Sequence, residues 1–91
     1  GLVNAHCHTP MTLVRGAGDG LPLWRWLTEA MWPREGRLTS EDVWWGMTLG
    51  SAEMLRSGVT TSCEMYLYEE AVVEAVQASG GRLVMTPGVL S

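Results

Sequence analysis

Residues 59–85, VTTSCEMYLYEEAVVEAVQASGGRLVM, decide the fold of this chain. The first part, VTTSCEMY (residues 59–66), begins with β-branched residues and predicts a strand. EEAVVEAVQASGG follows as a helix, with acids at its N-terminus, where the helix dipole favours them, and with Gly80 at its end. RLVMTPGVL predicts another strand, broken at Pro87 and Gly88. The stretch therefore predicts a compact β-α-β unit.

The same alternation extends toward the N-terminus. LTSEDVWWGMTLGSAEMLRSGV predicts a long helix that Thr39 caps at its start, with Asp42 completing a variant of the capping box and Gly58 closing the last turn. Residues 2–8, an apolar run that ends on polar residues, predict the first strand. The predicted order is β-α-β-α-β.

The segment between the first strand and the long helix is the least regular. RGAGDGLP (residues 15–22) carries three glycines, an aspartate and a proline, which is typical of a loop. LWRWLTEAMWP then predicts a short helix with Leu23, Trp26 and Leu27 on one face, and Pro33 is expected to end it.

Strands that alternate with helices predict an α/β fold with parallel strands and right-handed crossovers. Ligands of such folds bind at the carboxyl ends of the strands. The 91 residues are too few for a (β/α)₈ barrel, which needs roughly 250. Because the chain starts in a strand without an initiator methionine, we expect it to be a piece of a longer protein.

Composition excludes several classes of protein. Apolar residues make up 46% and charged residues 18%, which indicates a globular domain. A net charge of −4 with six scattered arginines and no lysine argues against nucleic-acid binding. No apolar run is long enough for a membrane span, and no signal-peptide pattern is present. Cys7 and Cys63 lack CxxC spacing, which favours reduced thiols in a cytoplasmic protein.

The two histidines of the chain, His6 and His8, stand one residue apart at the end of the first strand. On a strand they project to one face while Cys7 points to the other, so they form a bidentate pair for a metal ion. The alternative is a strand end with two solvated or hydrogen-bonded histidines. A catalytic zinc needs a third protein ligand. The candidates outside the helix surfaces are Asp19, Glu35 and Glu64.

Three segments, NAHCHTPMTLVRGAGDGLPLWRWL, EMLRSGVTTSCEMY and GRLVMTPGVL, resemble the amidohydrolase superfamily. The resemblance covers essentially the whole chain. It is strongest to the cytosine/guanine deaminase and chlorohydrolase branch, and within that branch to the S-adenosylhomocysteine/methylthioadenosine deaminases. It implies that residues 1–91 are the first three strands of a metal-dependent hydrolase (β/α)₈ TIM barrel, with the long loop after strand 1.

The resemblance also implies the chemistry. In that family one divalent metal, zinc or iron, is held in part by the two histidines of strand 1, here His6 and His8. Hydroxide on the metal attacks a carbon of a purine or pyrimidine base or nucleoside, and ammonia leaves. The other ligands and the proton-shuttling glutamate come from later strands, so no catalytic residue is assigned here, and the 91 residues alone are expected to be inactive.

Two further residues gain a role from the resemblance. Nucleoside-acting members bind the ribose through a glutamate after the first long loop, which corresponds to Glu35; the alternative is an exposed acid beside Arg34 and Arg37. Trp26 would line the substrate pocket, or else be a core tryptophan. The expected partner is a small heterocyclic substrate, with no membrane or nucleic acid, and a homo-oligomer is compatible with the family.

The chain departs from the family at two positions. Pro87 stands where members that act on S-adenosylhomocysteine can carry an arginine, which weakens the case for that substrate within the implied set and leaves methylthioadenosine, adenosine, a free base or a triazine open. Glu64 replaces a shorter acid. A triazine chlorohydrolase with the same metal chemistry, and a non-catalytic α/β module that binds a metal or a partner, are the alternatives.

Overall fold

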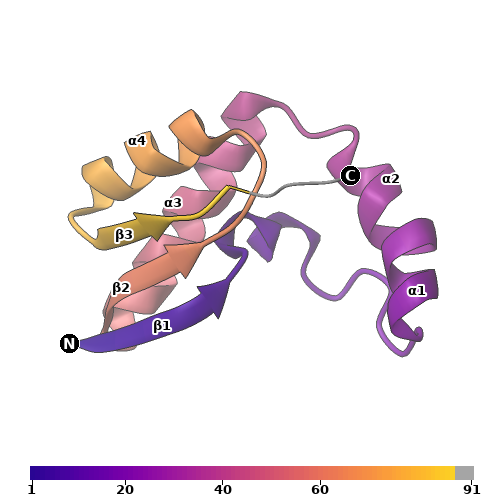
Figure 1. Ribbon diagram of the computed structural model, residues 1–91, viewed down its shortest axis with the longest axis horizontal. Helices are drawn as coiled ribbons and strands as arrows, with labels where there is room; N and C mark the ends of the chain where they lie inside the picture. The colour runs from indigo at the N-terminus through magenta and orange to yellow at the C-terminus, as the bar shows by residue number, and fades with distance from the viewer. Residues whose placement is uncertain (88–91) are drawn as a thin grey trace.

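The computed structural model describes residues 1–87 and contains one three-stranded parallel sheet. Its strands are β1 (Leu2–Cys7), β2 (Val59–Glu64) and β3 (Arg82–Met85), and they lie in the order β1-β2-β3. Cys7 at the end of β1 lies opposite Glu64 at the end of β2, so the carboxyl ends of these strands meet. The predicted parallel α/β arrangement is confirmed (Figure 1).

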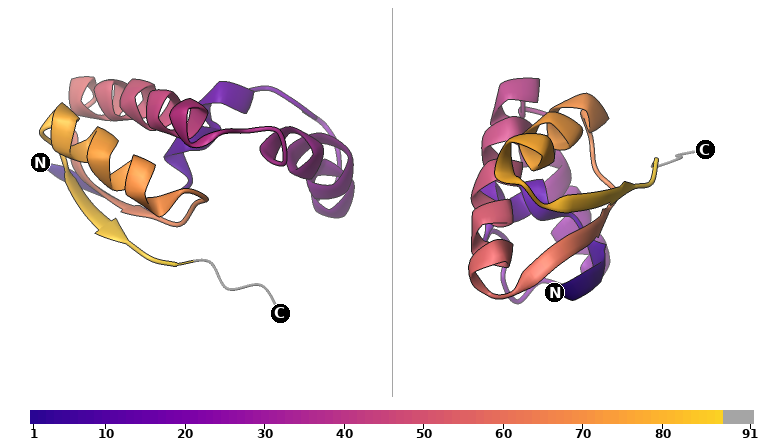
Figure 2. Two further views of the ribbon diagram at one scale, coloured as in Figure 1. Left: turned by 90° about the horizontal axis from the view of Figure 1, so that it is seen from above. Right: turned by 90° about the vertical axis from the view of Figure 1, so that its left-hand side faces the viewer.

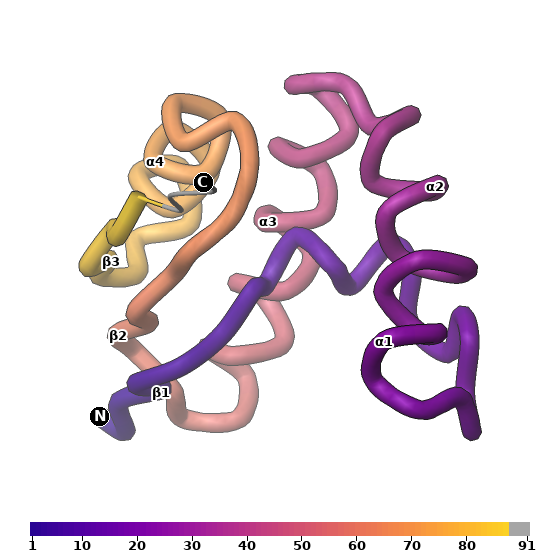
Figure 3. Tube along the Cα trace, turned by 45° about the vertical axis from the view of Figure 1, so that its right-hand side comes forward, coloured from indigo at the N-terminus to yellow at the C-terminus, as the bar shows by residue number. Residues whose placement is uncertain are grey.

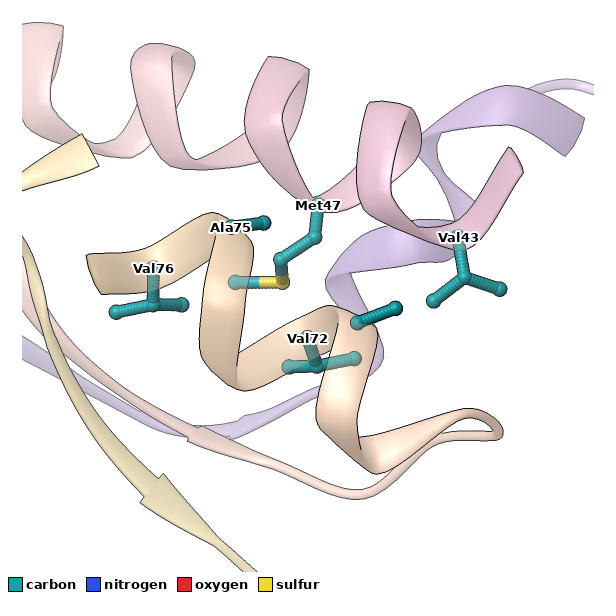
Figure 4. Packing of buried hydrophobic residues seen from close by; sticks show 6 residues of the cluster. Val43, Met47, Val72, Ala75 and Val76 are labelled. Carbon is teal, nitrogen blue, oxygen red and sulfur yellow. The ribbon is translucent and has the colours of Figure 1, made fainter. Parts of the chain in front are cut away.

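Two long helices cover one side of the sheet. They are α3 (Ser40–Arg56) and α4 (Glu69–Ser79), and Figure 2 shows both on the same side of the strands. Their facing surfaces form the core, which consists of the buried side chains of Val43, Met47, Ala71, Val72, Ala75 and Val76 (Figure 4). The sheet therefore has one covered side and one side that the described residues leave open.

The ends of the two helices follow the sequence predictions. The Thr39 hydroxyl accepts a hydrogen bond from the Asp42 N–H, and the Asp42 carboxylate accepts one from the Thr39 N–H, which forms a complete capping box. Gly58 and Gly80 follow α3 and α4 with φ of 89° and 85°. This left-handed conformation is the one that glycine adopts without steric cost at a helix end.

A short 3-10 helix, η1 (Thr9–Val14), follows β1 and packs on α3. The first strand ends at Cys7, one residue before the predicted end, because His8 already begins the turn into η1 with φ −131° and ψ 64°. Figure 3 shows the chain passing from β1 across α3 toward α1 and α2, which lie on the other side of α3 from the sheet.

The prediction that Pro33 ends the short helix is wrong. A single helical run comprises α1 (Leu23–Arg25), a π-helical segment η2 (Trp26–Met31) and α2 (Trp32–Glu35), so helix continues past Pro33. In the π segment the Trp32 N–H donates to the Leu27 carbonyl, five residues back. Pro33 is the second residue of α2, directly after this π turn, and because proline has no N–H it donates no hydrogen bond there.

The third strand ends at Met85, and Pro87 lies beyond it in an exposed position. The predicted break therefore begins where expected, while its second residue, Gly88, lies outside the described residues. Among residues 1–87, no helix has the length and apolar character needed to cross a bilayer.

Candidate metal centre

His6 and His8 lie side by side at the carboxyl end of β1. Their ring centroids are 5.2 Å apart and the ring planes meet at 82°. His6 is the second-last residue of the strand and is exposed, whereas His8 is half-buried at the start of η1. The structure thus brings together the two imidazoles that the sequence predicts as a pair, although only His6 lies in the strand itself.

The orientation of the His8 ring is fixed by β2. Its Nδ1 lies 2.6 Å from the carbonyl oxygen of Met65, the residue after β2. A carbonyl can only accept a hydrogen bond, so Nδ1 is the protonated nitrogen of the ring and donates to it. In the neutral ring this leaves Nε2 with its lone pair, which is the arrangement that metal-binding histidines show.

Glu64, the last residue of β2, is completely buried and anchors the turn after His8. Its Oε2 accepts the Thr9 N–H at 2.9 Å, and its Oε1 accepts both the Thr9 hydroxyl and the Cys7 thiol, the latter at 3.1 Å. The Met65 N–H also donates to the Cys7 carbonyl at 3.3 Å. Glu64 and Met65 therefore hold Cys7 and Thr9, the residues on either side of His8.

Cys7 points toward Glu64, as the alternation along the strand predicts. Burial, assisted by the hydrogen bond to the Glu64 carboxylate, raises the pKa of the Cys7 thiol to about 11. Cys7 is therefore a protonated donor and not a thiolate ligand. Both cysteines of the chain are free thiols.

The donor set fits a metal ion only in part. Within residues 1–87, no group of three or more histidine, cysteine, aspartate or glutamate side chains lies close enough together to hold one. Both Glu64 oxygens already accept hydrogen bonds, and Asp19 lies in an exposed loop. The two imidazoles supply two of the three or four protein ligands that zinc takes. The Nε2 atom of His8 is oriented by the hydrogen bond between its Nδ1 and the Met65 carbonyl.

Glu35 lies at the last position of α2 and is half-buried. Its carboxylate is beside the Tyr66 hydroxyl, and Tyr66 follows the end of β2. Among the described residues, Tyr66 Oη is buried and has no hydrogen-bond partner. Burial first, and the Glu35 carboxylate second, raise the pKa of Tyr66 well above its usual value of 10.0.

The alternative environment considered for Glu35, a pair of neighbouring arginines, is not what the described residues show. Arg34 donates to the carbonyl of Ala30, and the ion pairs within residues 1–87 are Arg15–Glu53 and Arg25–Glu29. Glu35 instead approaches a tyrosine that the sequence reasoning missed. Its position after β2, at the same edge of the sheet as the histidines, was the available signal.

Trp26 is partly buried at the start of the π segment. Its Cδ1 lies 3.1 Å from the place that a Cβ on Gly18 would occupy, and Gly18 has φ 74°. The ring therefore packs on the glycine-rich loop, and a larger residue at Gly18 would collide with Ala30, whose Cβ would lie 2.5 Å from the added atom.

These features agree with the comparisons to known proteins. The family model described as "Amidohydrolase family" matches residues 1–91, and the chain belongs to that family. It is 50% identical over 91 residues to a 5-methylthioadenosine/S-adenosylhomocysteine deaminase of Carboxydothermus hydrogenoformans, covering 100% of this chain and 21% of the relative. It is 49% identical over 90 residues to a 5'-deoxyadenosine deaminase of Methanocaldococcus jannaschii, covering 99% and 21%.

A solved structure agrees with these relatives. A crystal structure of an adenosine deaminase from Xanthomonas campestris with bound zinc superposes with a TM-score of 0.87 at 44% identity, over 92% of this chain and 19% of that one. The chain thus spans about a fifth of the length of the curated relatives that it matches. The class of protein and the parallel α/β fold are those that the sequence predicts.

Proposed function

We propose that this chain is the part of a metal-dependent deaminase barrel that contains strands 1 to 3. His6 and His8 are two of the ligands of one divalent metal, zinc in preference to iron, and the substrate is an adenine nucleoside such as methylthioadenosine or adenosine. The observation that carries the proposal is the imidazole pair with the His8 Nδ1 committed to the Met65 carbonyl. The relatives named as deaminases, and the one crystallised with zinc, support it.

Each residue of the pair has a definite task. His8 is oriented before the metal arrives, because its donor nitrogen is already occupied. His6, which is more exposed, completes a two-point attachment on the same side. A zinc ion held there supplies a Lewis acid that activates water for attack on the amino-bearing carbon of the purine, so that ammonia leaves.

Glu35 is proposed to bind the substrate ribose, since a carboxylate accepts hydrogen bonds from two neighbouring hydroxyl groups. The half-burial of Glu35 and its approach to Tyr66 support this role, because they give it a polar, partly enclosed setting beyond the end of β2. Trp26 is proposed to line the substrate pocket on the same side as Glu35. This polar end favours a nucleoside over the chlorinated triazine considered above.

The cellular setting is also part of the proposal. Two free thiols support a reducing, cytoplasmic location. The partner is the small-molecule substrate, and assembly as a homo-oligomer is proposed on the family likeness alone.

The test is metal content and deamination in the complete protein that carries these residues. His6→Ala and His8→Ala should each lower zinc affinity more than about a hundredfold, because losing a ligand costs more than losing an outer partner. Deamination of methylthioadenosine should fall with the bound zinc, while Thr60→Ala, an exposed change on β2, serves as the control. Stoichiometric zinc in the doubly substituted protein would refute the assignment.

The role of Glu35 has its own test. Glu35→Gln should raise KM for nucleosides about tenfold or more, since hydrogen bonds to charged groups are worth about 1.5–3 kcal/mol. It should leave KM for a free base, which has no ribose, unchanged. Arg37→Gln, an exposed neighbouring change, is the control. An equal effect on base and nucleoside would show that Glu35 does not contact the sugar.

The 91-residue chain alone should release no ammonia from any of these substrates, because its described part brings together only two ligands. Ammonia release by the purified 91-residue chain, absent from a His6→Ala, His8→Ala version, would contradict this expectation.

A further inference from the structure

Glu64 forms no ion pair among the described residues, yet it is completely buried. Burying a carboxylate is costly unless hydrogen bonds compensate for the lost water. All the donors that compensate it come from the first strand and the turn after it: the Thr9 N–H, the Thr9 hydroxyl and the Cys7 thiol. The carboxylate thus serves the geometry of residues 7–9.

The residue in the middle of that segment is His8. Its two chain neighbours, Cys7 and Thr9, are both held by Glu64, and its ring is held by the carbonyl of Met65, the residue next to Glu64. Glu64, the last residue of β2, therefore fixes the backbone on either side of His8, and Met65, the next residue, fixes the ring itself. Movement of Glu64 would shift the backbone and the ring together.

Glu64 does not fit the part of a metal ligand. Oε2 is taken by the Thr9 N–H, and Oε1 by the Thr9 hydroxyl and the Cys7 thiol, all on the side to which Cys7 points. The imidazoles project to the other side of the strand, because neighbouring residues alternate. The carboxylate and the metal site are therefore separated by the backbone of β1.

We propose that Glu64 is a positioning residue, which sets the His8 imidazole for metal binding by clamping Cys7 and Thr9 to the end of β2. The proposal deepens the proposed function and rests on it. Partners of this kind around a metal site typically change metal affinity by 10–100-fold when they are removed. The length of the glutamate side chain is what allows it to reach the Thr9 N–H across the strand ends.

The experiment measures zinc affinity of the complete protein by competition with a chelator, and the visible spectrum of the cobalt-substituted protein, which reports ligand geometry. Glu64→Gln replaces one acceptor oxygen with an NH₂ group, which then faces a donor of Thr9 or Cys7 and cannot accept its hydrogen bond. It should weaken zinc binding about 10–100-fold and alter the cobalt spectrum. Glu64→Asp keeps the two acceptor oxygens on a shorter side chain. Its zinc affinity and cobalt spectrum should therefore lie between those of Glu64→Gln and the unchanged protein.

Two further variants separate positioning from folding. Ser62→Ala removes another buried polar group of β2 and should leave affinity and spectrum unchanged. Thr9→Val removes the hydroxyl donor but keeps the N–H, so it should weaken zinc binding less than Glu64→Gln does, and it remains informative where Glu64→Gln does not fold.

The outcomes distinguish the two proposals. Unchanged affinity and spectrum in folded Glu64→Gln, or in Thr9→Val where Glu64→Gln does not fold, would overturn the role of Glu64 while the zinc-binding wild type still supports the proposed function. Equal losses in Ser62→Ala would also overturn it. A wild-type complete protein that binds no zinc would instead refute the proposed function.

Discussion

The Tyr66 hydroxyl is a polar atom in an unusual place: buried, without a hydrogen-bond partner among the described residues, and beside the Glu35 carboxylate. Ionisation there would place a negative charge in a desolvated position next to a second negative charge. Both effects disfavour the phenolate. Tyr68, the other tyrosine, is exposed and donates to the Leu38 carbonyl.

This environment predicts the alkaline behaviour of the protein. The folded state keeps Tyr66 protonated above pH 10, the usual tyrosine pKa, while the unfolded chain ionises there. The native state then binds more protons than the unfolded state, so the free energy of unfolding falls as the pH rises past about 10. Glu35→Gln should bring the Tyr66 pKa closer to its usual value and soften that fall.

The measurement is an ultraviolet titration of phenolate in the complete protein, with Tyr66→Phe subtracted to isolate this residue. Tyr68→Phe, which removes the other tyrosine of the chain, is the matched control. An ordinary pKa for Tyr66, or one that Glu35→Gln does not lower, would contradict the prediction.

Between elements, η1 lies directly against α3. A Cβ on Gly46 would lie 2.6 Å from the Pro10 carbonyl oxygen, and one on Gly50 would overlap the Thr9 side chain. Both glycines are buried in α3. Their lack of a side chain lets η1 lie directly on the helix, which places the start of η1 under the histidine pair.

Gly50→Ala should therefore destabilise the protein, although alanine is the better helix former. Overpacking of this kind costs about 1–3 kcal/mol. The displaced Thr9 should also weaken zinc binding, because Thr9 follows His8. Chemical denaturation and zinc competition check both effects, with Ala52→Ser on the exposed side of α3 as a control that changes stability by less than about 0.5 kcal/mol. A stabilised Gly50→Ala would show that η1 can move away freely.

For the whole molecule, the open side and the edge of the sheet are the dominant features. Large apolar side chains are exposed there: Val84 is 53% exposed on β3, and Leu2 and Val3 are each 65% exposed on β1. Trp24 is 67% exposed; it lies on the helical run from α1 to α2 (Leu23–Glu35, the α1–α2 arm), which stands apart from the sheet (Figure 1). Contiguous apolar surface and unpaired strand edges favour association with other chains.

The isolated 91-residue chain should accordingly self-associate in a concentration-dependent way. Sedimentation velocity over a range of concentrations measures this. Val84→Lys should reduce the association, because it places a charge on the open side, whereas Thr60→Lys, at a position that is already polar and exposed, is the comparison. A chain that stays monomeric throughout would mean that these apolar groups are not sufficient for association.

Local sequence determined much of this protein. The capping box at Thr39, the glycines after α3 and α4, and the β-branched strands were predictable, because their physical causes lie within a few residues. The pairing of His6 with His8 was predictable for the same reason. The prediction that Pro33 ends the short helix was wrong, because the π turn before it depends on hydrogen bonds that residue propensities do not encode.

The tertiary structure decided what those residues do to one another. Only the register of β1 against β2 sets Glu64 across from Cys7, brings the Met65 carbonyl to His8, and lets Glu64 bond the residues on either side of His8. Only the path of the α1–α2 arm brings Glu35 to Tyr66, 31 positions away in the sequence. Sequence specifies contacts between near neighbours, whereas these contacts join distant segments and exist only once the sheet and its helices have packed.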